Sequence, residues 1–135
     1  YLKKKFISFI NPEYIKFIVD KEGKLVTFSI TMPSFARALQ KANGKLFPTG
    51  FIHLLKAKKK SKSSVFFLIG ILPEYQKKGV TAIVFDEFFK TYKEKGVEKM
   101  IITPELEENK DIQLIWKNFK PEVYKKRCTM RKDLP

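Results

Sequence analysis

Cysteine and histidine are almost absent from this chain of 135 residues, which has one of each. The single Cys128 cannot form an intramolecular disulfide, which fits a reducing compartment and predicts a cytoplasmic protein. One cysteine and the single His53 cannot supply a His/Cys zinc site, so we expect no metal. Nothing local supports a Cys–His catalytic pair. We expect His53 to be a partly buried strand residue and Cys128 to pack as a small apolar side chain.

Long apolar runs are also missing, and none approaches the ~18 residues of a membrane span. Residues 1–10, YLKKKFISFI, lack a small-residue cleavage site and are not expected to be a signal peptide. Acidic residues are scarce: the chain has 14 Asp and Glu but 28 Lys and Arg, which gives a net charge of +14. Such a field attracts phosphorylated cofactors, nucleic acid, anionic lipid or acidic proteins without choosing among them. The simplest account of any single lysine is a solvated surface.

Apolar residues are plentiful by contrast, at 44% of the chain with 13 phenylalanines. This content excludes general disorder and suffices for one core, so residues 1–135 are predicted to form a single domain. The first residue is Tyr1 rather than Met. We therefore expect a fragment, or the C-terminal part, of a longer chain.

The first half of the chain predicts a hairpin and a helical insertion. Residues 14–20 and 25–33 are β-rich and flank a glycine-bearing turn, which predicts an antiparallel pair. Residues 34–43 have helix start and stop signals, with Ser34 as the expected N-cap. Residues 47–57 fit either a second short helix or an irregular apolar segment. The following stretch KKKSKSS, residues 58–64, is expected to be a flexible loop because its charge and serine content oppose packing.

The second half predicts alternating strands and helices. Residues 64–72 are nearly all apolar, which predicts a central strand buried on both faces. A helix with a wide apolar face is expected to follow from about Gly79 to Gly96. Three further elements are predicted, namely a strand at 97–103, a helix at 109–119 with Asn109 as N-cap, and an edge strand at 122–134.

These elements combine into an α/β fold with a mixed, mostly antiparallel central sheet and flanking helices. The leading hairpin is antiparallel. The strand–helix–strand unit at 64–103 predicts a parallel pair with a right-handed crossover.

A basic, glycine-containing turn lies between the central strand and the long helix. The amides at a helix N-terminus have no intrahelical partner, and they suit a phosphate or pyrophosphate. Gly79 permits close approach by an anion, Lys77 and Lys78 add charge, and Gln76 adds a neutral hydrogen-bonding group. The alternative is a plain connector that binds nothing.

The stretch LPEYQKKGV, residues 72–80, resembles the acyl-CoA-binding motif of the GNAT N-acetyltransferase superfamily. That motif is Gln or Arg, two free positions, Gly, one free position, then Gly or Ala. Gln76, Gly79 and Thr81 occupy its three fixed positions. The segments NPEYIKFIVD, LQKANGKLFPTGF and LEEN are similar to a poorly characterised bacterial branch of that superfamily, so the resemblance covers nearly the whole chain.

The resemblance implies a parallel pair of strands that splits apart, with the pantetheine of acetyl-CoA bound along the exposed strand edge. The diphosphate would lie against the amides of residues 76–81, and the acyl carbonyl would meet an N–H near Ile71. Asn109 would open the helix beside the pantetheine arm. The implied cofactor-binding residues are Ile69, Ile71, Leu72, Gln76, Lys77, Lys78, Gly79, Val80, Thr81 and Asn109.

The implied reaction is transfer of an acyl group, expected to be acetyl, from coenzyme A to a small-molecule or protein amine. Many such enzymes use a tyrosine to protonate the leaving thiolate, but the expected helix offers Trp116 and Phe119 instead. Tyr124 is the candidate acid, and Glu108 is the candidate base for the amine. Thr81 also departs from the Gly or Ala of the motif.

Two other functions stay open from the sequence. A degenerate lobe that binds acyl-CoA without catalysis would explain Thr81 and the missing tyrosine. A nucleic-acid-binding module would use the basic segments KAKKKSKSS and YKKRCTMRK, although no recognition-helix pattern is present. The Phe-rich faces and an exposed strand edge leave a homodimer open.

Overall fold

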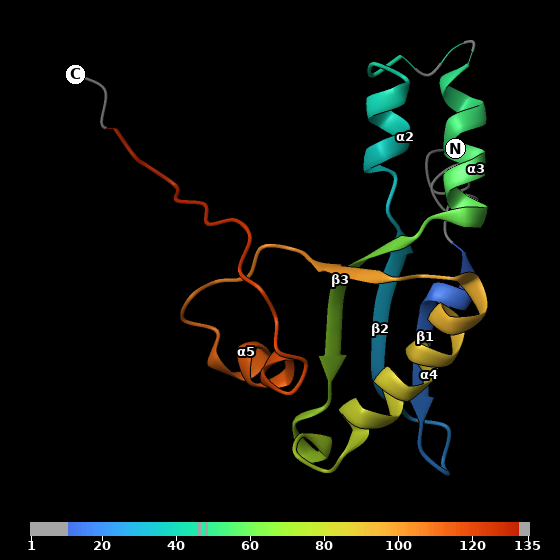
Figure 1. Ribbon diagram of the computed structural model, residues 1–135. Coiled ribbons are helices and arrows are strands. Elements are labelled where there is room, and N and C mark those ends of the chain that lie inside the picture. Colours follow the sequence, from blue (N-terminus) through green and yellow to red (C-terminus); the bar gives the residue numbers. More distant parts are fainter. Residues whose placement is uncertain (1–10, 46, 48, 133–135) are drawn as a thin grey trace. The chain divides into compact units, whose positions relative to one another are not determined.

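The computed structural model describes residues 11–45, 47 and 49–132 (Figure 1). Residues 1–10, where no signal peptide is expected, lie outside the described residues, as does the end of the predicted final strand at 133–135. The chain divides into two compact units, Tyr1–Ile102 and Thr103–Pro135, and each is described by itself.

The described part of the first unit contains the predicted hairpin. A short 3-10 helix η1 (Pro12–Tyr14) leads into strand β1 (Ile15–Val19), which pairs antiparallel with β2 (Leu25–Pro33). The carboxylate of Asp20 accepts the backbone N–H of Lys24 at 2.8 Å and so closes the turn.

Strands β3 (Ser63–Ile71) and β4 (Lys99–Ile102) complete a four-stranded sheet in the order β1-β2-β3-β4. β3 is antiparallel to β2 and parallel to β4. The predicted mixed sheet with one parallel pair is confirmed, although β4 is shorter than the expected strand at 97–103.

Two helices form the insertion between β2 and β3. They are α2 (Ala36–Lys41) and α3 (Gly50–Lys60), and they contact each other. The expected flexible loop at 58–64 is wrong, because α3 continues through Lys60 and β3 begins at Ser63. Lysine favours helix, so its charge does not end one.

Two smaller expectations for this insertion are also wrong. His53 is half-buried in α3 rather than in a strand. Phe35, not Ser34, holds the N-cap position of α2 and makes no side-chain cap bond, while the Ser34 hydroxyl lies 3.5 Å from the Ala36 amide.

Helix α4 (Val80–Lys95) covers one face of the sheet and supplies more of the buried apolar residues described than any other element. Its buried apolar residues are Val80, Val84, Phe85, Phe88 and Tyr92. The predicted wide apolar face is only partly buried, because Ile83 and Phe89, which were expected on it, are 55% and 48% exposed. The rings of Phe85 and Phe88 lie 5.9 and 6.4 Å from the ring of Phe66 on β3, which is 1% exposed. Gly96 ends the helix at φ 65°, as its position predicted.

Small polar residues of the strands lie under these aromatic rings. Thr27, Ser29, Thr31 and Ser64 are fully buried. Their hydroxyls are satisfied, for example by the carbonyl of Gly70 for Thr27 at 2.6 Å and by the Tyr92 hydroxyl for Ser64 at 2.9 Å. Burial raises the pKa of Tyr92, although its contact with Ser64 opposes this.

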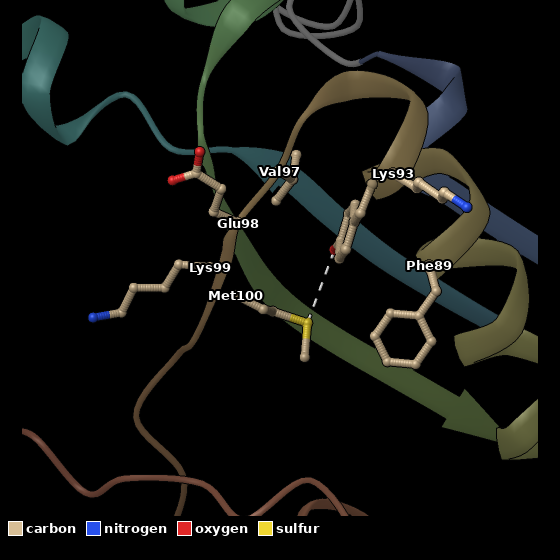
Figure 2. A pocket seen from close by; sticks show the side chains of 7 residues that line it. Phe89, Lys93, Val97, Glu98, Lys99 and Met100 are labelled. Atoms are coloured by element: carbon tan, nitrogen blue, oxygen red, sulfur yellow. Dashed lines mark hydrogen bonds between the residues drawn. The ribbon is translucent and has the colours of Figure 1, made fainter.

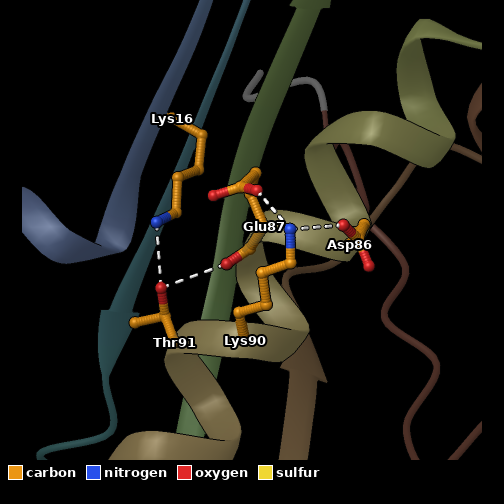
Figure 3. A network of polar contacts seen from close by, with 5 residues as sticks. All are labelled: Lys16, Asp86, Glu87, Lys90 and Thr91. Atoms are coloured by element: carbon orange, nitrogen blue, oxygen red, sulfur yellow. Dashed lines mark hydrogen bonds and ion pairs between the residues drawn. The ribbon is translucent and has the colours of Figure 1, made fainter.

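A polar network joins β1 to α4 (Figure 3). The Lys16 ammonium donates to the Thr91 hydroxyl at 2.9 Å, and that hydroxyl donates to the Glu87 carbonyl at 3.1 Å. Lys90 is paired with Asp86 at 2.8 Å and with Glu87 at 2.7 Å. The Lys16–Thr91 bond connects the helix to the hairpin, and the other contacts lie within α4.

The face of β3 that points away from α4 is less covered than the sequence predicted. Phe67, which is 45% exposed, and Leu68 remain partly solvent-accessible, so burial on both faces is wrong. On this face Phe28 lies opposite Gly70, and a Cβ on Gly70 would lie 2.6 Å from the Phe28 ring.

The second unit contains helix α5 (Lys110–Lys117), which begins as predicted. The Asn109 side chain accepts the Ile112 N–H at 3.3 Å. Trp116 is buried, and its indole N–H donates to Glu105 at 2.7 Å. The expected edge strand at 122–134 is wrong over its described part, where the backbone is irregular. Cys128 is exposed rather than packed.

Candidate acyl-CoA-binding site

Strand β3 loses one neighbour halfway along its length. β4 pairs only with residues 63–66 of β3, whereas β2 stays paired as far as Ile71. The Leu72 N–H donates to the Val26 carbonyl at 3.0 Å. Because successive residues of a strand direct their backbone groups to opposite edges, those of Ile69 and Ile71 face the edge that β4 has left. The predicted split of the parallel pair is therefore present, and the Leu72 amide is occupied within the sheet.

The turn after β3 is tied to the distant hairpin. It begins with a 3-10 helix η2 (Pro73–Tyr75). The Lys24 ammonium pairs with Glu74 at 2.8 Å, and this hydrogen bond lowers the pKa of Glu74. The Tyr75 hydroxyl donates to Asp20 at 3.4 Å. Partial desolvation and the Asp20 charge raise the pKa of Tyr75.

The backbone between η2 and α4 adopts an alternating conformation. Lys77 and Gly79 have positive φ angles of 62° and 78°, whereas Lys78 between them does not. Backbone of alternating handedness turns successive N–H groups toward one concave side, an arrangement that binds anions. Gly79 occupies the N-cap position of α4 and makes no side-chain cap bond. A Cβ built on Gly79 would have no protein atom within 4 Å, so the space before the helix is open.

Most amides of this turn are not used by the protein. Within the described part of the chain no hydrogen-bond acceptor is found for the N–H groups of Lys77, Gly79, Val80 and Thr81. The Gly79 carbonyl, by contrast, accepts from Ala82 at 3.0 Å and from Ile83 at 3.4 Å. The start of α4 thus presents donors and the positive end of the helix dipole together.

The side chains of the turn have different roles. Gln76 donates its amide to the Ile71 carbonyl at 3.5 Å, where it caps the exposed end of β3. The Lys78 ammonium lies 5.4 Å from the centre of the Tyr75 ring. Lys77 is exposed, and Thr81 is half-buried in the first turn of α4. The predicted residues 69–81 therefore gather at one end of β3.

The other predicted residues, Glu108, Asn109 and Tyr124, belong to the second unit. Asn109 is the N-cap of α5, Glu108 is exposed, and Tyr124 is 73% exposed in irregular backbone. Their roles toward coenzyme A stay predictions.

A shallow open pocket of about 380 Å³ lies between the C-terminal end of α4 and strand β4 (Figure 2). Phe89, Lys93, Val97 and Met100 are among the residues that line it, and the Tyr92 hydroxyl lies 3.9 Å from the Met100 sulfur. None of the predicted site residues lines this pocket.

Sequence reasoning missed the residues that anchor the turn. Asp20 and Lys24 lie 55 and 50 positions from their partners Tyr75 and Glu74. No local pattern identifies such pairs.

Within the described residues no group of three His, Cys, Asp or Glu side chains could hold a metal ion. The helices of that same part of the chain are all too short or too polar to cross a bilayer.

No family profile matches the sequence, and no curated protein is similar to it in sequence. Solved structures are similar in fold. The aminoglycoside 6′-N-acetyltransferase AAC(6′)-Ih from Acinetobacter baumannii aligns with a TM-score of 0.58 at 9% identity, over 98% of this chain and 79% of that chain. The ribosomal-protein-alanine N-acetyltransferase from Brucella melitensis biovar Abortus 2308 aligns with a TM-score of 0.52 at 13% identity, over 88% and 72%.

A third structure, AAC(6′)-Iy with the bisubstrate analogue CoA-S-monomethyl-acetylneamine, aligns with a TM-score of 0.52 at 14% identity, over 90% of this chain and 71% of that chain. The chain has the GNAT N-acetyltransferase fold. The GNAT resemblance of the sequence is thereby confirmed at the level of the fold. In this GNAT fold the half of β3 that β4 leaves unpaired leads directly into the turn at residues 76–81.

Proposed function

We propose that this chain binds acetyl-CoA and transfers its acetyl group to an amine. The observation that carries the proposal is the turn at residues 76–81. Its backbone alternates in handedness at the start of a helix of 16 residues, and four of its amides have no acceptor among the described residues, an arrangement that suits a diphosphate.

The exposed edge of β3 supports a binding mode for the rest of the co-substrate. The backbone groups of Ile69 and Ile71 that face this edge would hydrogen-bond the two amides of pantetheine as an added strand does. An N–H at this edge would also stabilise the negative charge that develops on the thioester oxygen.

The chemistry needs no covalent enzyme intermediate. The amine nitrogen attacks the thioester carbon, a C–N bond forms, and the C–S bond breaks to release the coenzyme A thiolate. The amine loses one proton and the thiolate gains one. We assign the base to Glu108 and the acid to Tyr124, with kcat of Glu108→Gln and Tyr124→Phe as the measurement that tests each role.

A binding-only lobe is the second candidate, and one observation favours it. The helix that carries the thiolate acid in many GNAT enzymes has Trp116, whose indole N–H is bonded to Glu105 at 2.7 Å, and no tyrosine. Such a lobe would bind acetyl-CoA, but no amine added to it would cause release of the free coenzyme A thiol.

Titration calorimetry with acetyl-CoA and with S-acetylpantetheine, which lacks the diphosphate, tests the proposal. We expect acetyl-CoA to bind at least about tenfold more tightly, since charge-assisted hydrogen bonds to the diphosphate contribute 1.5–3 kcal/mol each. Equal affinity for the two thioesters would contradict the assigned turn. A thiol-release assay over a panel of amines then separates an enzyme from a binding-only lobe.

A further inference from the structure

The helical insertion carries basic charge without acidic charge. No Asp or Glu lies between Glu22 and Glu74. We call residues 34–62, which contain α2, α3 and their connection, the basic hairpin. Its cationic residues are Arg37, Lys41, Lys45, Lys56, Lys58, Lys59, Lys60 and Lys62. Lys62 is neutralised by Glu98 at 2.6 Å, but the remaining charge has no acidic counterpart in the hairpin itself.

The basic hairpin also exposes large apolar side chains. Phe47 in the connection is 88% exposed, and Ile52 on α3 is 63% exposed. Phe51 and Leu55 are about half exposed and lie beside Ile52 at helical spacing. Exposed apolar side chains cost free energy in water, so a cluster of them indicates a surface that meets an apolar partner.

The lysines of α3 continue this same exposed side. Lys56, Lys59 and Lys60 are exposed, whereas His53 and Leu54 are half-buried. The helix therefore places apolar residues in its first turns and ammonium groups in its last turns. Long lysine side chains reach from such a position to a charged layer while their methylenes stay in apolar surroundings.

The acetyl-CoA site does not explain this charge. The basic hairpin connects to the first residue of β3, and the turn at 76–81 follows the last residue of the same strand. A strand of 9 residues separates its ends by roughly 30 Å, which exceeds the screening length of about 8 Å at physiological salt.

We propose that the basic hairpin docks on the surface of an anionic lipid membrane. The charge is complementary to acidic headgroups, and Phe47, Phe51 and Ile52 would enter the boundary between headgroups and acyl chains. Nucleic acid would leave the aliphatic Ile52 and Leu55 exposed to water. Protein interfaces favour Arg and are depleted in Lys, whereas the basic hairpin has one Arg among its cations.

Packing holds the basic hairpin in one shape for this role. A Cβ on Gly50 would collide with the backbone carbonyl of Lys45, so the first residue of α3 lies directly against the backbone of the connection. Ala38 and Ala42 are buried, and the Ala42 side chain would lie 3.1 Å from the same Cβ.

Co-flotation of the full chain with vesicles tests this proposal, which is independent of acetyl-CoA binding. Wild type should float with phosphatidylcholine–phosphatidylglycerol vesicles (two to one) and stay behind with pure phosphatidylcholine. The triple variant K56Q/K59Q/K60Q should bind about 100-fold more weakly, since each lysine beside an anionic surface contributes roughly fivefold. Ile52→Ser should weaken binding by about tenfold, because an apolar side chain leaves the interface.

The matched control is K125Q/K126Q/K132Q, which removes equal charge from the C-terminal segment and should change vesicle affinity by less than about threefold. An equal loss in both triple variants would overturn the proposal in favour of a net-charge effect. Undiminished vesicle binding by Ile52→Ser, with tighter binding of a single-stranded oligonucleotide than of vesicles, would overturn it in favour of nucleic acid. An unchanged far-UV circular dichroism spectrum establishes that each variant is folded.

Discussion

The two ends of strand β3 present positive charge in different ways. Before Ser63 the charge is on lysine side chains of the basic hairpin, which are long and solvated. After Ile71 it is on main-chain N–H groups held by the positive φ angles of Lys77 and Gly79. Side chains supply attraction without fixed geometry, whereas backbone donors select the shape of the anion. The comparison teaches that one strand separates two unlike forms of positive charge, which can be altered independently by mutation.

The largest effect should come from the core between the two ends. Phe66→Ala removes a fully buried ring that contacts Phe85 and Phe88, and we expect a loss of about 3–5 kcal/mol in the free energy of unfolding. The neighbouring Phe67→Ala is the control, with an expected loss below about 1.5 kcal/mol because Phe67 is 45% exposed. Urea denaturation measures both. Equal losses would mean that β3 is not anchored through α4.

The next effect should be on acetyl-CoA affinity. Gly79→Leu places a side chain in the open space before α4 and strains a residue at φ 78°, so we expect binding to weaken by about tenfold or more. Gly96→Leu imposes similar strain at φ 65° at the far end of α4, again with no protein atom near the new Cβ. It should reduce stability but leave affinity within about twofold. Titration calorimetry measures the acetyl-CoA affinity of both variants. Equal affinities would show that Gly79 is not part of the binding site.

A smaller effect should come from the charges beside the turn. K77Q/K78Q should weaken acetyl-CoA binding by about threefold to tenfold at low salt and by less at high salt, since exposed charges are screened. K56Q/K59Q/K60Q at the other end of β3 should leave this affinity within about twofold. If both variants lose affinity alike, the result would mean that the net charge of +14, and not the turn, attracts acetyl-CoA.

The smallest effect should be a pH dependence of stability from the Lys24–Glu74 pair. The pKa of Glu74 is lowered in the folded state by its hydrogen bond to Lys24. Its contribution is therefore present above the unfolded carboxyl pKa of about 4.3 and is lost as the pH falls through the lower folded value. Both groups are exposed, so we expect the pair to raise the Tm by only ~1–2 °C. Glu74→Gln should lose this increase. A Tm difference between wild type and Glu74→Gln that stays constant from neutral pH to below the carboxyl pKa would contradict it.

Local signals predicted the elements that position the site. Gly79 and Gly96 mark the two ends of α4 because each adopts a positive φ angle that other residues rarely accept. The hairpin and the parallel pair followed from periodicity and from the order of strands and helices. The anchoring of η2 by Asp20 and Lys24 was not predictable, because it joins residues that are distant in sequence.

The errors have physical causes as well. The polar alternation of residues 122–134 suggested a strand, but alternation alone does not form one without a paired neighbour, and the described part is irregular. Exposure of Phe67 and Leu68 shows that an unbroken apolar run does not establish burial on both faces. The roles of Glu108 and Tyr124 depend on side-chain placement around a bound co-substrate, which composition and spacing do not encode.

The contact between Gly70 and Phe28 has a consequence for the evolution of this sheet. The aromatic ring occupies the volume that any other residue at position 70 would need. A relative with alanine or a larger residue there should carry a smaller side chain at position 28, so substitutions at these two sites should be inherited as a pair.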